Sequence, residues 1–183
     1  MKFGLTILAG MVIFAGSVSA QGVTRINQHK DWDSFKASGL GDGYADCWIA
    51  ADPSATVNTK AGEVVQVNRD DILLQVAFRK GSPNPEIAFT GGYYYNDGAT
   101  VAVVVDGSSY TFMTKNAPNA SGQSIGWAWP RDPSDEAKIV GAMKRGAEAV
   151  VTGRSSRGTT TKDTFSLLGF TAALADAQRA CTN

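Results

Sequence analysis

Two cysteines, Cys47 and Cys181, constrain the fold of this chain most, because they lie far apart and the sequence contains no third cysteine. In an oxidising compartment, a single pair of cysteines is expected to form one disulfide bond. A bond that closes so long a loop stabilises the folded state by roughly 4 to 5 kcal/mol in the chain-entropy model. Two unrelated buried thiols are the alternative.

The start of the chain, residues 1–20, has the pattern of a secretory signal peptide. Lys2 precedes a largely apolar run over residues 3–15, and Val18 and Ala20 occupy the positions that a signal peptidase reads. We therefore expect cleavage after Ala20. A permanent membrane anchor is the alternative, but this apolar run is shorter than the roughly 20 residues that a helix needs to span a bilayer.

The remaining residues, 21–183, have the size of a single domain with a hydrophobic core. The whole sequence has 17 basic and 17 acidic side chains, and Lys2 is the only charged residue of the leader. A mature chain with almost no net charge has no electrostatic feature that favours nucleic acid or an anionic membrane. We expect a protein of the periplasm, the outer surface or the medium, with no membrane span after cleavage.

Short segments with an apolar residue at every second position indicate β-strands. Residues 72–79 show this pattern from Ile72 to Phe78, and residues 21–30 are expected to be a polar lead-in. Asp106 and Gly107 have favourable turn chemistry for a hairpin between their flanking segments. Strands are expected over residues 44–51, 72–79, 87–93, 101–105, 110–113, 149–152 and 164–168.

Two helices are expected in the C-terminal third. Asp132 is placed to cap a helix that starts at Pro133, and its apolar stripe consists of Ile139, Val140 and Met143. A second helix is expected from about residue 170 to residue 180. Many short strands with few helices predict a mainly β fold, a β-sandwich with one or two short helices near its C-terminus.

A series of short motifs carries a family resemblance. The most specific motif begins at Ser156-Arg157-Gly158-Thr159, reaches Ser166-Leu167, and continues through Gly169-Phe170 to Cys181. The other motifs are Cys47-Trp48-Ile49-Ala50, Gly92-Tyr93, residues 103–107, Trp127-Ala128-Trp129 and residues 142–146. Through these motifs the chain resembles the invasion-associated locus B family of exported bacterial proteins, from about Trp32 onward.

This resemblance implies an immunoglobulin-like β-sandwich in the periplasm or at the outer surface. The family takes its name from a member that helps a pathogen to enter red blood cells, so host-cell invasion is one setting that the resemblance implies. The family offers no established catalytic residue to transfer.

Candidates for catalysis or metal binding are few. His29 is the only histidine, and the expected polar lead-in does not provide the packed surroundings that a catalytic imidazole requires. One histidine and a bridged pair of cysteines do not make a zinc site. Asp70 and Asp71 precede a strand, and the acidic residues near Asp132 lie where a helix N-terminus favours negative charge. We expect no catalytic residue, metal or cofactor.

Asp163 is expected to carry a carboxylate towards the core, because it shares a strand face with Phe165. An inward carboxylate needs a partner, and Arg157 lies just upstream. We hypothesise that Arg157 and Asp163 form a structural ion pair that braces the turn, with a ligand site as the alternative. The turn over residues 153–159 is also rich in donors for a phosphate or sulfate, although a solvated hairpin explains it as well.

Aromatic residues gather in two segments, residues 91–95 and 126–130. In an extended backbone Tyr94 faces away from its two neighbours, whereas Trp127 and Trp129 share a face. Core packing is one explanation for these rings. Exposed Tyr and Trp are favoured at protein contacts and on sugar-binding faces, so Tyr94, Trp127 and Trp129 are the candidate contact residues.

The function that these observations predict is that of a non-enzymatic exported protein acting by contact with an envelope component or a host-cell surface. A small-ligand or glycan-binding module is the alternative, and a hydrolase is third. A contact protein should show a broad apolar patch, and a glycan binder an aromatic ring beside polar side chains. An enzyme should show a deep pocket with perturbed titrating groups.

Overall fold

The structure is a computed structural model that describes residues 22–38, 45–79, 82, 84–118 and 124–182. The expected signal peptide and its cleavage site lie outside these residues. The described residues form a 12-stranded sheet in the order β1-β2-β3-β6-β7-β10-β9-β8-β11-β12-β4-β5. Within the same ranges, no helix has both the length and the apolar character needed to cross a membrane.

The described residues form mainly β-strands, and the helices lie in the last third of the chain. The strands are β1 (Gly22–His29), β2 (Trp32–Ser38), β3 (Cys47–Ala51), β4 (Ala55–Lys60), β5 (Glu63–Val64), β6 (Leu73–Phe78), β7 (Glu86–Thr90), β8 (Thr100–Val105), β9 (Ser108–Pro118), β10 (Ser124–Pro130), β11 (Glu148–Arg154) and β12 (Thr160–Ser166). The helices are the 3₁₀ turn η1 (Pro133–Asp135), α1 (Glu136–Met143) and α2 (Phe170–Thr182).

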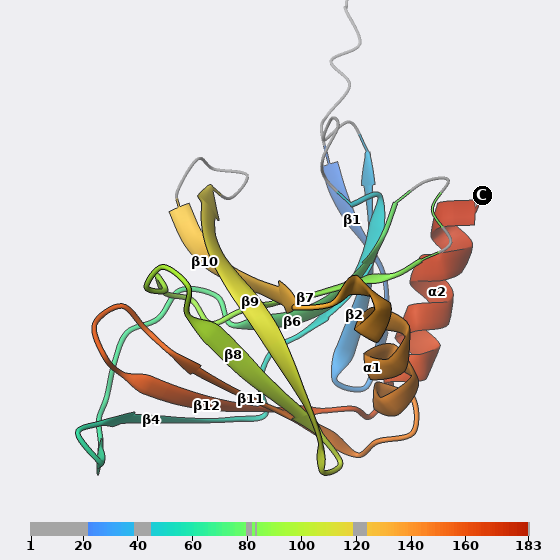
Figure 1. Cartoon of the computed structure of the whole chain (residues 1–183). Coiled ribbons are helices and arrows are strands. Elements are labelled where there is room, and N and C mark those ends of the chain that lie inside the picture. The colour runs from blue at the N-terminus through green and yellow to red at the C-terminus, as the bar shows by residue number, and fades with distance from the viewer. Residues whose placement is uncertain (1–21, 39–44, 80–81, 83, 119–123, 183) are drawn as a thin grey trace, which may run out of the picture.

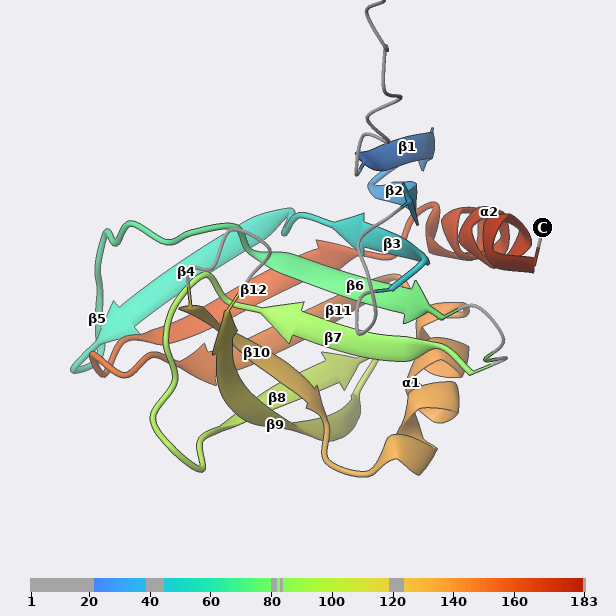
Figure 2. The same cartoon turned by 90° about the horizontal axis from the view of Figure 1, so that it is seen from above.

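The sheet curves back on itself, so that two layers face each other across the core (Figures 1 and 2). One layer contains β3, β6 and β7, the other contains β8, β11, β12 and β4, and strands β9 and β10 connect them. Phe89 of β7 and Phe165 of β12 meet edge to face across the core, with ring centroids 6.1 Å apart. This arrangement confirms the predicted mainly β sandwich with short helices near the C-terminus.

The alternating pattern of the central strands determines which side chains enter the core. Leu74, Val76 and Phe78 of β6 are buried, as their period of two predicts. Asp106 and Gly107 both have positive φ angles, 43° and 83°, and join β8 to β9. Positive φ at both central residues is the conformation that a tight hairpin requires, so the predicted hairpin is confirmed.

The first strand contradicts the expectation of a polar lead-in over residues 21–30. Strand β1 pairs with β2 from Gly22 to His29, with a shift in register between Arg25 and Asn27. Most side chains of β1 are exposed, so its sequence lacks the alternation that marks a half-buried strand. Strands β4 and β5 were also not predicted, and they lie at the other edge of the sheet.

Helix α1 begins as the sequence predicts. The Asp132 carboxylate accepts a hydrogen bond from the backbone N–H of Ser134 at 2.9 Å, and Pro133 starts a short 3₁₀ turn that leads into α1. Ile139, Val140 and Met143 are buried. The helix therefore packs its apolar stripe against the end of the core, beside α2 in Figure 1.

Helix α2 covers the inner face of the part of the sheet formed by β1, β2 and β3 (Figure 2). The rings of Trp32 and Phe170 meet edge to face at 4.9 Å, and the Trp32 indole N–H donates to the Ser166 carbonyl at 2.8 Å. Gly169 begins the turn into α2 at φ 91°, and an added Cβ would lie 1.8 Å from the His29 carbonyl oxygen. Only glycine permits this close approach.

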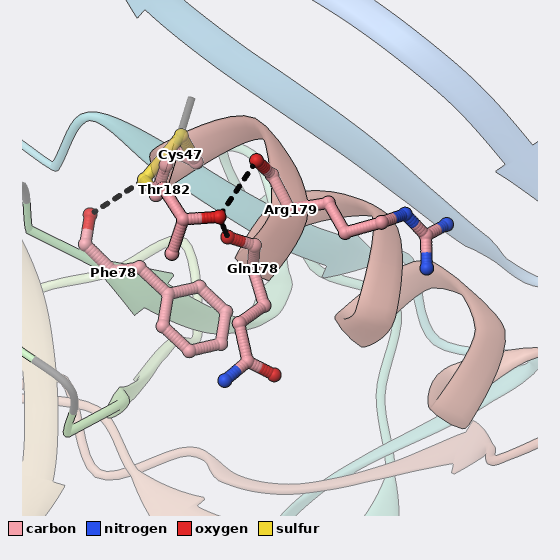
Figure 3. Close-up of a disulfide and its surroundings, with 6 residues drawn as sticks. Cys47, Phe78, Gln178, Arg179 and Thr182 are labelled. Atoms are coloured by element: carbon pink, nitrogen blue, oxygen red, sulfur yellow. Dashed lines mark hydrogen bonds between the residues drawn. A yellow bond between two sulfur atoms is a disulfide. The ribbon is translucent and has the colours of Figure 1, made fainter.

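A disulfide between Cys47 and Cys181 joins the end of α2 to β3, as predicted, with Cα atoms 5.7 Å apart (Figure 3). The Cys181 sulfur lies 3.7 Å from the Phe78 carbonyl oxygen of β6. In the last turn of the helix, the Thr182 hydroxyl donates to the carbonyl oxygens of Gln178 and Arg179. The two cysteines are 134 residues apart in the sequence. The bond between them therefore holds α2 against the sheet.

We predict that replacing both Cys47 and Cys181 by Ala lowers the free energy of unfolding by about 4 kcal/mol, because the unfolded chain loses its cross-link. Urea unfolding of the oxidised protein with and without reductant measures this difference. The double variant is the control, since its midpoint should not respond to reductant. An equal midpoint for oxidised and reduced wild-type protein would contradict the prediction.

Candidate binding site

A buried ion pair lies at the end of the sandwich that is remote from the helices. The Asp163 side chain of β12 has no exposed surface, and the Arg69 side chain is 5% exposed. The Arg69 guanidinium donates to both carboxylate oxygens of Asp163, at 2.8 and 2.6 Å. A two-point pair of this kind is the strongest geometry available to these groups.

Other polar groups surround the Arg69–Asp163 pair. Arg69 donates from Nε to the Gly91 carbonyl at 2.7 Å, and from Nη1 to Thr56 and Asn58 of β4 at 3.2 Å each. The Thr56 hydroxyl donates to Asp163. The pair therefore links β4 and β12 to the segments before β6 and after β7.

The predicted ion pair between Arg157 and Asp163 is wrong, because the partner of Asp163 is Arg69. The inward direction of Asp163 is confirmed by its burial, but Arg157 is exposed and forms no ion pair with any residue that the structure describes. Asp163 lies four residues beyond Thr159, about 13 Å along an extended strand. The Arg157 side chain is too short to span that distance from the turn.

Beside the buried pair lies a cavity of about 260 Å³. Three segments enclose it: the segment before β6, the turn after β7, and the β11–β12 turn, which Figure 1 shows at the end away from the helices. Its lining includes Tyr94 and Arg157, both candidates from the sequence. The remaining lining residues are Val67, Asn68, Arg69, Asp70, Gly92, Tyr93, Ser155, Ser156, Thr159 and Thr161.

Two tyrosines form the inner part of this region. The Tyr93 hydroxyl lies 2.8 Å from the Thr161 hydroxyl, and the Tyr93 ring meets Tyr95 at 5.0 Å and lies under the Arg69 guanidinium at 5.2 Å. Burial raises the pKa of both phenols above their usual value. They are therefore neutral hydroxyl groups at physiological pH and are not poised to act as bases.

A second surface carries aromatic rings on the outer face of the sheet. Phe35 of β2 stacks on Trp48 of β3, with centroids 5.4 Å apart. Trp127 and Trp129 of β10 lie 6.4 Å apart, on one face as predicted. All four rings are half-buried.

The strand register places these two pairs on the same face. Trp48 pairs with Ala77, and Ala77 pairs with Glu86 of β7. Four residues further along β7, and so on the same face, Thr90 pairs with Trp127. Their neighbours in sequence, such as Ile87 and Ala128, point into the core. We call Phe35, Trp48, Trp127 and Trp129 the outer aromatic face.

The three aromatic candidates from the sequence therefore belong to two surfaces. Tyr94 is 49% exposed and lines the cavity, whereas Trp127 and Trp129 do not line it and lie on the outer aromatic face. Phe35 and Trp48 were not recognised as contact candidates. The signal for them was an aromatic residue in each of two neighbouring strands, and only the strand register shows that they stack.

His29 is held at the end of β1 and not in a polar lead-in. Its Nε2 atom lies 2.5 Å from Oδ2 of Asp176 in α2, and Asn27 donates to the same oxygen at 2.7 Å. Arg179 pairs with the other carboxylate oxygen. The hydrogen bonds from His29 and Asn27 lower the pKa of Asp176. This cluster fastens α2 to the first strand.

Among the described residues, no group of three or more His, Cys, Asp or Glu side chains is arranged to hold a metal ion. Of the carboxylates that the sequence offers as candidates, Asp132 caps η1, and Asp70 lies on the rim of the polar cavity.

The fold and its covalent bond define a small, disulfide-bridged antiparallel β protein with two layers. A family model described as Invasion associated locus B (IalB) protein matches residues 34–178, and the chain belongs to this family. Its fold is similar to that of a crystal structure of invasion associated protein b from Bartonella henselae, with a TM-score of 0.51 and 14% sequence identity. That similarity covers 82% of this chain and 94% of the other. No curated protein matches the chain.

We predict that Arg69→Met lowers the free energy of unfolding by about 3 to 5 kcal/mol, because it leaves the Asp163 carboxylate buried without its partner. Arg157→Met is the matched control, and it should change stability by less than about 0.5 kcal/mol. Urea unfolding at neutral pH measures both. A larger loss of unfolding free energy for Arg157→Met than for Arg69→Met would contradict this prediction and support the ion pair between Arg157 and Asp163.

The contacts of Asp176 predict that part of the free energy of unfolding depends on pH in the acid range. Because the folded pKa of Asp176 is lowered, its contribution is fully present above the unfolded carboxyl pKa of about 3.9 and is lost as pH falls through the folded value. Asp176→Asn should therefore be less stable than wild type at pH 6, with a difference that shrinks below about pH 4. Thermal unfolding across pH tests this. A difference that grows in acid would contradict it.

Proposed function

We propose that this member of the family is an exported, non-enzymatic protein that acts by contact with a protein partner in the cell envelope or on a host surface. The outer aromatic face is the observation that carries the proposal. Half-buried tryptophans are enriched at the centres of protein interfaces, where they bury a large apolar area at little cost in side-chain entropy.

The composition of this face suits a protein partner. Two ring pairs, Phe35 with Trp48 and Trp127 with Trp129, lie at its two ends. Between them lie the small buried side chains Ala77 and Ala88. Met113, 39% exposed, is opposite Trp129 in the register. A mixture of aromatic, thioether and small side chains is the composition found at protein contacts.

Export is supported by two observations of different kinds. The pattern of residues 1–20 is that of a cleavable leader. The disulfide between Cys47 and Cys181 is of a kind that persists in oxidising compartments such as the bacterial periplasm. We therefore propose the periplasm, the outer surface or the medium as the location.

A photoreactive side chain placed at Lys115 tests the proposal. Lys115 is exposed and pairs with Trp127 on the outer aromatic face, whereas the exposed Lys162 of β12 lies on the other layer and is the matched control position. After illumination of intact cells, we expect a protein adduct from position 115 and none from position 162. Trp127→Ala with Trp129→Ala should reduce that adduct at least tenfold, because a hot-spot tryptophan contributes ~2 kcal/mol or more and each 1.4 kcal/mol changes affinity about tenfold.

The same experiment identifies the result that would contradict the proposal. Equal adducts from both positions, or an adduct that persists undiminished in the double tryptophan variant, would show that the outer aromatic face is not the contact surface. The thermal unfolding midpoint of each variant is measured alongside, so that a loss of folding is not mistaken for a loss of contact.

A further inference from the structure

The cavity at the end of the sandwich presents polar groups that the protein itself does not use. The side chains of Asn68, Asp70, Ser156 and Arg157 and the hydroxyl of Thr159 form no hydrogen bond or ion pair with any described residue. Thr159 is also buried, with 7% of its surface exposed. The Thr159 hydroxyl is not one of the fully buried side-chain atoms that lack a partner. It therefore faces the space of the cavity and is available there to a ligand or to water.

Arg69 adds a further donor to this cavity. A guanidinium has five N–H groups, and the carbonyl of Gly91, both oxygens of Asp163 and the side chains of β4 account for four of them. One N–H on Nη2 has no acceptor among the described residues. The Arg69 side chain is 95% buried and lines the cavity, so this N–H is available to a group bound in the cavity.

The charges around the cavity cancel. Arg69 is neutralised by Asp163, and on the rim the exposed Arg157 is balanced by the exposed Asp70. A site for phosphate or sulfate gathers donors and excludes carboxylates, since a carboxylate accepts hydrogen bonds and repels an anion. A neutral ligand that both donates and accepts hydrogen bonds fits this set of groups better.

The rim also offers an apolar platform. Tyr94 is 49% exposed and Val67 is 38% exposed. The Tyr94 carbonyl accepts a hydrogen bond at 2.7 Å from the backbone N–H of Ser156, which fixes the position of Tyr94 relative to the polar turn. An amphipathic ring beside groups that donate and accept hydrogen bonds is suited to the C–H face and hydroxyl edge of a sugar.

We propose that this cavity is a binding site for a neutral saccharide. One sugar ring stacks on Tyr94, its hydroxyls donate to Asp70 and accept from Arg157, Asn68 and Arg69, and the rest of the glycan extends into solvent. The volume of about 260 Å³ lies just below the range of pockets that enclose drug-sized ligands. It therefore suits a single ring and not a longer buried segment. The site is separate from the outer aromatic face and does not rest on the proposed protein contact.

An array of neutral oligosaccharides built from hexose and N-acetylhexosamine tests the proposal with the oxidised, leader-free protein. The best binder is then titrated and followed by NMR. We expect shifts of the backbone amide signals of residues 68–70, 92–94 and 155–159. Sodium phosphate is titrated separately as the anionic probe.

Matched variants locate the site. Tyr94→Ala and Asp70→Asn should each weaken saccharide binding by about tenfold or more, since a hydrogen bond to a charged group or a stacked ring contributes that much. Asp97→Asn and Arg154→Gln change an exposed carboxylate and an exposed arginine that do not line the cavity, and they should bind within about twofold of wild type. The unfolding midpoints of all four variants should match wild type.

Three results would each overturn the proposal. The first is that no glycan on the array binds. The second is that phosphate binds in the cavity in place of saccharide and binds more tightly to Asp70→Asn. The third is that saccharide binding survives Tyr94→Ala but is lost in Trp127→Ala, which would move the site to the outer aromatic face.

Discussion

The carboxylate of Asp163 lies where no water reaches it, and the structure of one end of the domain depends on supplying this carboxylate with a partner. Leaving such a group unpaired would cost several kcal/mol, so Arg69 must enter the interior from the segment before β6. This requirement draws that segment across the end of the sandwich. Gly92 permits the crossing, since an added Cβ would lie 2.3 Å from the Asp70 carbonyl oxygen. The wall of the cavity is therefore a consequence of a structural ion pair.

Two surfaces with different chemistry result from this architecture. The outer aromatic face extends across β2, β3, β6, β7 and β10, and its rings stand on the side of the sheet opposite to the core and to α2. The cavity is polar, electrically balanced and built from loops at one end. The outer aromatic face therefore uses side chains that point away from the core, whereas the wall of the cavity includes Arg69, which the buried ion pair requires.

A strand can be predicted from the sequence when one of its faces is buried and the other is exposed. Strands such as β6 were predicted because one face is buried, which produces alternation, whereas β1 exposes most of its side chains and shows none. The inward direction of Asp163 was predictable for the same reason. Its partner was not, because Arg69 lies 94 residues earlier and no local pattern connects the two. The stacking of Phe35 on Trp48 likewise depends on strand register.

The pairing of β4 with β12 has a consequence for how the chain reaches its native state. Thr56 lies opposite Asp163 in that ladder, so two segments more than a hundred residues apart must find each other before the second layer is complete. Non-local pairings of this kind make folding slow. A chain that emerges from a ribosome or a translocation channel with its N-terminus first has β4 available early and β12 very late. Its native topology is therefore reached only after nearly the whole polypeptide has been delivered, which leaves the nascent chain open to chaperones until then.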